Sequence, residues 1–288
     1  MKLKTHLRLL TAAVLAALLV ASQLAFARQK PEPLTKDETY YALARRAIEQ
    51  NESPVSNVVG ALDEVIEVGE ITVAADGKTT AVLKEKTSAA SGQPKAIRAT
   101  FVPANGKWRW DTFEDRGRFY PADKLFPVTK SELGRFKQTA DTGWAKVIEA
   151  MTKQGEAATK VLETAKAVIK TEPAPLVPVS SARKTLAEAL AHVKDTGDWE
   201  PVRSAFRELT MAIEPMATLG ERYPDLKAND AWLRLHEEFL AVQKSLPAVR
   251  KSYVDAVAVY NDQLSRLPYG LVAYGLGFMK MEPLVEAE

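Results

Sequence analysis

The stretch of residues 232–267, WLRLHEEFLAVQKSLPAVRKSYVDAVAVYNDQLSRL, decides the fold of the C-terminal part of this chain. Its apolar side chains recur every three or four residues, so they lie on one face of a helix. These are Trp232, Leu235, Phe239, Val242, Leu246, Val249, Tyr253, Ala256, Tyr260, Leu264 and Leu267. At about 1.5 Å per residue such a helix is roughly 54 Å long. Other long helices are needed to cover its apolar face.

Three further amphipathic segments precede this helix and repeat the same spacing. The first is expected to start near Thr129 or Ser131, the second to be capped by Ser180 or Ser181, and the third to start near Asp198. Since the connections are short, the four segments predict an all-α, antiparallel four-helix bundle with long helices over residues 129–288.

Capping residues and prolines refine this prediction. Asn229 or Asp230 is expected to cap the last helix. Pro215 lies inside the third segment and Pro247 inside the fourth, and proline removes a backbone donor and clashes with the preceding turn. We therefore expect a kink at each of these two positions.

Residues 28–128 have a different pattern, which predicts an α+β domain. One helix is expected from about Asp37 to Gln50, and a second short helix follows. Two pairs of β-rich segments then meet across Asp76-Gly77 and Asn105-Gly106, which are strong hairpin signals. The pattern predicts a four-stranded antiparallel β-meander with one or two helices packed on it.

The first 27 residues have the pattern of a targeting segment. A basic start is followed by an apolar run from Leu9 to Phe26, and the segment ends in the small-x-small sequence Ala25-Phe26-Ala27. This predicts a signal peptide cut after Ala27. The alternative is an uncleaved membrane anchor, since the run is nearly long enough to span a bilayer. Either alternative predicts export, to the periplasm or to the periplasmic side of the inner membrane.

The bulk composition excludes several function classes. The 39 basic and 37 acidic side chains nearly cancel, which argues against nucleic acid as a partner because phosphate binding needs a concentrated basic face. The chain contains no cysteine, so disulfides, thiolate metal sites and cysteine nucleophiles are excluded.

Trp108 and Trp110 are the first candidate partner-binding residues. They lie two positions apart in a predicted strand, so both side chains project from the same face. One interpretation is that they belong to the core beneath the helices. The alternative is an exposed aromatic surface for a partner or a glycan.

The C-terminal segment from Tyr269 to Leu284 is apolar but has no helical spacing. It is expected either to fold back and close one end of the helical region or to form an apolar patch that docks on a membrane surface or a partner. Tyr274 and Phe278 are the candidate contact residues of that patch.

Reactive groups are scarce. His236 is followed by Glu237-Glu238 but lacks the second histidine that a zinc-protease helix places four residues on, so we interpret it as a solvated helix residue. Gly77-Lys78-Thr79 lacks the upstream glycine of a phosphate-binding loop. We therefore expect no catalytic residue, no bound cofactor and no metal site.

The C-terminal part resembles the LemA family. The residues that carry the resemblance include the segment Tyr223–Asn229, the helix positions Arg250, Tyr253 and Tyr260-Asn261, and the tail sequence Leu276-Gly277-Phe278. The resemblance covers about residues 130–288. It implies a helical bundle in a bacterial envelope protein whose biochemical role is poorly defined, and it carries over no catalytic residue. The β-containing domain before the bundle departs from the family pattern.

The sequence therefore leads to a hypothesis of a non-enzymatic envelope protein that acts as a helical scaffold or adaptor for an envelope protein partner. The alternative is a periplasmic ligand-binding protein with a cleft between the two predicted domains, favoured if the rings of Trp108 and Trp110 are exposed. Association with a second copy of the chain through surplus apolar surface is left open.

Overall fold

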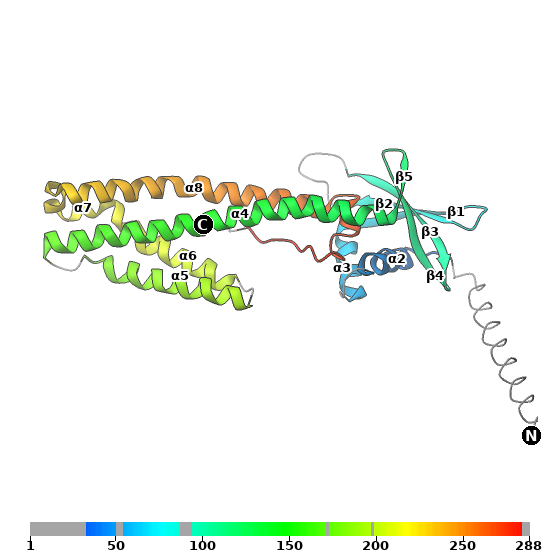
Figure 1. The fold of residues 1–288 in the computed structure, drawn as a ribbon, viewed down its shortest axis with the longest axis horizontal. Coiled ribbons are helices and arrows are strands. Elements are labelled where there is room, and N and C mark those ends of the chain that lie inside the picture. Colours follow the sequence, from blue (N-terminus) through cyan, green and yellow to red (C-terminus); the bar gives the residue numbers. More distant parts are fainter. Residues whose placement is uncertain (1–32, 50–53, 87–93, 171–172, 197–198, 284–288) are drawn as a thin grey trace, which may run out of the picture. The chain divides into compact units, whose positions relative to one another are not determined.

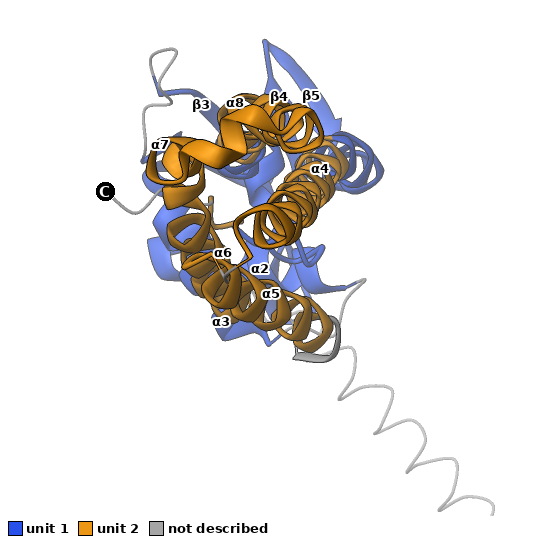
Figure 2. Ribbon diagram, turned by 90° about the vertical axis from the view of Figure 1, so that its left-hand side faces the viewer, with its two compact units in different colours: residues 1–135, 260–280 blue, residues 136–259, 281–288 orange. Residues whose placement is uncertain are grey.

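A computed structural model describes residues 33–49, 54–86, 94–170, 173–196 and 199–283 (Figure 1). The predicted signal segment, residues 1–27, lies outside this range. The chain forms two compact units (Figure 2). The N-terminal unit contains the described residues up to Arg135 together with Tyr260–Lys280, and the helical unit contains Phe136–Val259 and the described residues from Met281 on. The sequence alone had suggested a division after residue 128, with everything that follows in one domain.

The N-terminal unit begins with two helices, α2 (Lys36–Ile48) and α3 (Val55–Val65). Five antiparallel strands follow in the sheet order β1-β2-β3-β4-β5. Their bounds are Ile66–Val73 (β1), Thr79–Glu85 (β2), Ala96–Ala104 (β3), Lys107–Asp115 (β4) and Arg118–Pro121 (β5). The predicted α+β domain with an antiparallel meander and two helices is confirmed.

The fifth strand was missed by the sequence analysis. The hairpin at Asn105-Gly106 was expected, and both of its residues have the positive φ of a two-residue turn, 51° and 73°. Arg116-Gly117 has nearly the same backbone, with φ of 51° and 76°, and it joins β4 to β5. Arginine is not a usual residue at this turn position, so these two residues carry no hairpin signal.

The core of the N-terminal unit lies between one face of the sheet and α2 and α3. Side chains alternate along each strand, so every second residue enters the core. The buried sheet residues include Val68, Ala81, Leu83, Ile97, Ala99, Phe101, Trp110 and Phe113. The hydroxyl of Tyr40, on α2, donates to the carbonyl of Ile66 at 2.9 Å and fixes the helix to β1.

The helical region begins with a 3₁₀ turn, η1 (Ala122–Lys124), and the long helix α4 (Leu125–Ile169). The helices α5 (Leu176–Thr196) and α6 (Glu200–Ile213) follow. The short segments η2 (Glu214–Thr218), α7 (Leu219–Arg222) and η3 (Pro224–Ala228) lead to the second long helix, α8 (Asp230–Ser265). The tail then contains one 3₁₀ turn, η4 (Tyr269–Leu271).

Two of the expected helix starts were wrong. Helix α4 begins several residues before Thr129, and α5 begins before Ser180, so the hydroxyl residues taken as caps lie inside helices. In each case a proline occupies the first turn, Pro127 in α4 and Pro178 in α5. Proline is tolerated there because the first backbone N–H groups of a helix have no intrahelical partner. Both helices can therefore start before the residues that were expected to begin them.

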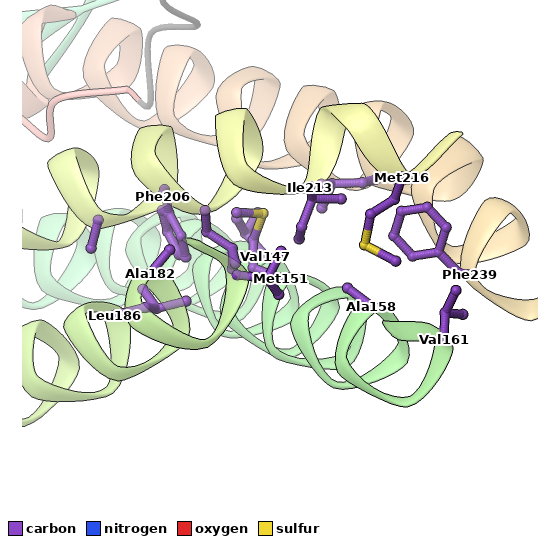
Figure 3. Close-up of a cluster of buried hydrophobic side chains, with 14 of the residues drawn as sticks. Val147, Met151, Ala158, Val161, Ala182, Leu186, Phe206, Ile213, Met216 and Phe239 are labelled. Carbon is purple, nitrogen blue, oxygen red and sulfur yellow. The ribbon is translucent and has the colours of Figure 1, made fainter. Parts of the chain in front are cut away.

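The helical unit has one large apolar core, to which α4, α5, α6 and α8 all contribute (Figure 3). The labelled residues are Val147, Met151, Ala158 and Val161 of α4, Ala182 and Leu186 of α5, Phe206 and Ile213 of α6, Met216 of η2, and Phe239 of α8. Long helices in a helical C-terminal region are thus confirmed. The antiparallel four-helix bundle itself stays a prediction.

Of the two internal prolines, Pro215 lies where an α-helix ends and Pro247 lies within a continuous helix. At Pro215 the α-helical pattern stops and η2 begins, which agrees with the expected interruption. Pro247 lies inside α8, and the helix is continuous through it from Asp230 to Ser265.

Candidate interaction surfaces

Trp108 and Trp110 are core residues. Trp110 has no exposed surface, and its indole Nε1–H donates to the carbonyl of Thr112 at 3.0 Å. Trp108 is 8% exposed, and the guanidinium of Arg45 on α2 donates to its backbone carbonyl at 3.4 Å. The exposed aromatic surface proposed for these residues is therefore corrected: both rings lie on the face of the sheet that α2 covers.

The C-terminal tail is joined to the sheet through Glu85, at the end of β2. The side chain is 7% exposed. Its Oε1 accepts a hydrogen bond from the backbone N–H of Leu267 at 2.8 Å, and its Oε2 accepts one from the backbone N–H of Lys95 at 2.8 Å. The Lys95 ammonium in turn donates to the carbonyl of Leu267 at 3.2 Å and pairs with Asp115 at 2.6 Å. One buried carboxylate thus ties the tail to the loop before β3.

Beyond Leu267 the tail packs closely on α2 and α3. A Cβ atom at Gly275 would lie 2.5 Å from the Cβ of Ala47 on α2, and one at Gly270 would lie 3.0 Å from a methyl group of Val65 on α3. The hydroxyl of Tyr260 donates to the carbonyl of Met279 at 2.8 Å, so the tail also folds back along the end of α8. Folding back, onto an end of the helical region, was one of the two expected alternatives for this segment, and contacts with α2 and α3 were not expected.

The two candidate contact residues of the tail differ in exposure. Tyr274 is 9% exposed, its hydroxyl has no hydrogen-bond partner in the described structure, and burial, with the nearby Glu64 carboxylate, raises its pKa above the ordinary value. Phe278 is half-buried, and its N–H donates to the carbonyl of Ala273 at 3.0 Å. Met279 beside it is 65% exposed. In the described part of the tail, exposed apolar surface therefore lies at Phe278 and Met279.

An aromatic cluster lies in the helical unit around Trp144 of α4. Its ring centroid is 5.1 Å from that of Trp199, 5.6 Å from that of Phe206 and 5.2 Å from that of Tyr253, the first two in edge-to-face geometry. Gly143 makes the approach of α8 possible, because a Cβ atom there would lie 3.3 Å from the Cα of Tyr253. Burial raises the pKa of Tyr253, whose hydroxyl donates to the carbonyl of Glu282 at 3.4 Å.

Trp199 is the exposed member of this cluster. It precedes α6 and is 39% exposed. Beside it, the Arg203 guanidinium bridges Glu200 at 2.9 Å and Glu282 at 2.8 Å, and Arg207 pairs with Glu200 at 3.1 Å. A rigid, partly exposed indole ring bordered by charged pairs has the composition of a protein-binding hot spot.

His236 is not a solvated residue as expected. Its ring stacks on Trp232 at 4.5 Å, and its Nε2 lies 3.1 Å from the carbonyl oxygen of Met216. Within the described ranges no group of three or more metal-binding side chains is placed to hold an ion. A helix both long and apolar enough to cross a membrane is likewise not found in the part of the chain that the structure describes.

Sequence reasoning missed the residues that matter most here. The burial of Glu85 has no sequence signal, because its two donors lie 10 and 182 residues away. Trp199 lies just outside α6, at its N-cap position. Its neighbour Pro201, in the first turn, was the available signal of a helix start.

A family model for the LemA family matches residues 143–288, which is more than half of the chain. The chain therefore belongs to the LemA family, and the match covers the helical unit except residues 136–142. Membership suggests an envelope-associated protein of poorly defined role. A search of curated proteins found no match.

Proposed function

We propose that this protein is exported and acts in the cell envelope as a non-enzymatic adaptor, whose helical unit contacts an envelope protein through the exposed ring of Trp199. The observation that carries the proposal is the packing of this ring edge-to-face on Trp144 at 5.1 Å while 39% of the residue stays in solvent. A ring held this way loses little conformational entropy when a partner covers it.

The surroundings of Trp199 support a contact of this kind. The neighbouring arginines are already paired with Glu200 and Glu282, so a partner gains a polar rim without desolvating unpaired charges. Family membership agrees with a place in the envelope. The alternative of a ligand-binding cleft between two domains loses its main support, since it was favoured only if the rings of Trp108 and Trp110 were exposed, and both are buried.

The test is crosslinking in living cells with a photoreactive amino acid at position 199. Position 211 is the matched control, because Met211 lies on α6, the helix that follows Trp199, and is 65% exposed. We expect a crosslinked envelope protein, identified by mass spectrometry, from position 199 and not from position 211. Trp199→Ala should abolish co-purification of that protein, and Met211→Ala should leave it unchanged. Equal crosslinking from both positions, or none from position 199, contradicts the adaptor hypothesis.

Export is tested separately by the mass of the mature protein. A chain that begins at Arg28 in the periplasmic fraction supports the signal peptide. A full-length chain in the inner-membrane fraction supports the anchor, and a full-length chain in the cytoplasm contradicts export.

A further inference from the structure

An open pocket of about 290 Å³ lies on the N-terminal unit, on the face of the sheet opposite α2 and α3. Its walls come from β2, β3, β4 and the turn before β5. The lining residues are Val82, Ala96, Ile97, Arg98, Glu114, Arg116 and Gly117. A pocket of this size accommodates a small molecule or a single head group and not a protein segment.

The two arginines that line the pocket differ in whether a carboxylate of the pocket balances their charge. Arg98 Nε lies 3.1 Å from Glu114 Oε2, so these two side chains form an ion pair. Arg116 is exposed, and the described structure records no ion pair or hydrogen bond for its guanidinium. The pocket therefore holds one guanidinium whose charge is balanced by Glu114 and a second one that is not balanced by the pocket.

The backbone conformation of Arg116 is a second observation that points to a binding site. The residue has a φ of 51°, in the left-handed region that asparagine and glycine adopt more readily than arginine. An arginine here costs backbone energy that an asparagine at the same turn largely avoids. Backbone strain of this kind at the rim of a pocket points to a side chain selected for function.

We propose that this pocket binds an oxyanion, a carboxylate or phosphate group, between the guanidinium groups of Arg98 and Arg116. Guanidinium groups bind oxyanions through paired N–H donors, and two of them form a clamp. Glu114 opposes the anion and holds Arg98 in place when the pocket is empty. This site is independent of the proposed adaptor surface, which lies in the helical unit.

The experiment uses the full mature chain and titrates inorganic phosphate by calorimetry at low ionic strength. Arg116→Asn keeps the turn and removes the charge, and Arg98→Gln removes the other donor. Each is expected to weaken phosphate binding at least tenfold. Arg118→Gln is the matched control, because Arg118 is an exposed neighbour that does not line the pocket. It should change the affinity less than twofold.

Glu114→Gln is expected to strengthen phosphate binding, whereas the two arginine substitutions weaken it. Removing the carboxylate takes away the repulsion and releases Arg98, so phosphate should bind several-fold more tightly. Three results would overturn the proposal. They are weaker binding in this variant, an equal loss in Arg118→Gln, and no binding of phosphate to the native chain at concentrations on the order of 10 mM. Thermal unfolding of every variant shows that each one is folded.

A second arm distinguishes the source of the oxyanion. Vesicles of phosphatidylglycerol and of phosphatidylcholine are compared by co-sedimentation. Retention on phosphatidylglycerol vesicles that depends on Arg116 and not on Arg118 supports the site and identifies a lipid head group as its ligand. Phosphate binding with no vesicle retention supports the site with a free oxyanion as its ligand.

Discussion

Glu85 accepts hydrogen bonds from the backbone N–H groups of Lys95 and Leu267 while it is almost fully buried. In Glu85→Gln the amide nitrogen must face one of these donors, which leaves a buried N–H without an acceptor. Hydrogen bonds to a charged group contribute about 2 kcal/mol each, so the variant should lose about that much free energy of unfolding. Urea denaturation measures the loss. Glu70→Gln, on the exposed part of β1, should be neutral, and a neutral Glu85→Gln would contradict the assigned role.

The raised pKa of Tyr274 predicts that the N-terminal unit loses stability at alkaline pH. Its pKa is raised above the ordinary value of 10.0 by burial, so the folded state holds the proton more tightly than the unfolded state. This stabilisation is complete below about pH 10 and is lost as the pH rises through the folded-state pKa.

Tyr274→Phe removes the ionisable group together with a hydroxyl that has no partner in the described structure. The variant should match the native chain at pH 7 and be more stable than it at pH 11. Thermal unfolding at the two pH values tests this, and the measurement at pH 7 is the internal control. A variant less stable than the native chain at both values contradicts the interpretation.

At the level of helices and segments, Gly275 sets how closely the tail approaches α2. Any side chain there meets the Cβ and the backbone of Ala47, and backbone atoms cannot move aside easily. Gly275→Ala should therefore cost about 1–3 kcal/mol of unfolding free energy. Gly60→Ala is the control, because Gly60 lies in α3 with open space around it, and alanine there should stabilise the helix by about 0.5–1 kcal/mol. Chemical denaturation of both variants checks the opposite signs.

The helices and hairpins that the sequence predicted are those whose signals are local. Asn105-Gly106 supplies a turn by its own backbone preference. Asn229 caps α8 through a hydrogen bond from the N–H of Trp232 to its side-chain oxygen at 2.9 Å, three residues along the chain. Two helix starts were missed because Thr129 and Ser180 are residue types that often cap helices, but each lies inside a helix that starts earlier, with a proline in its first turn.

The candidate sites were less predictable because they depend on contacts between distant residues. Spacing correctly placed Trp108 and Trp110 on one face, but the choice between a buried and an exposed face depends on α2, more than fifty residues earlier in the chain. The pocket between β3 and the β4–β5 turn requires the fifth strand, which had no sequence signal. Family resemblance located the helical region but carried no site with it.

At the scale of the whole molecule, deleting the C-terminal tail tests whether it stabilises the N-terminal unit. Deletion of residues 269–288 uncovers the apolar residues of α2 and α3 that it contacts, so amide hydrogen exchange should rise in α2 and α3 and stay unchanged in α5. Hydrogen-exchange mass spectrometry measures both. Deletion of residues 284–288 alone is the control. Unchanged protection of α2 and α3 after the longer deletion would show that the tail serves docking and not the stability of the N-terminal unit.

The hydrogen bond between Glu85 and Leu267 closes a loop of 182 residues, and this has a consequence for biosynthesis. During synthesis, the first strands of the N-terminal unit leave the ribosome long before the segment that contains Leu267. During that interval the N-terminal domain exposes apolar surface, and such surface is what holding chaperones bind and quality-control proteases cut. A chain truncated before Leu267 lacks this hydrogen bond, so we expect its N-terminal unit to be cut by proteases more readily than that of the full chain.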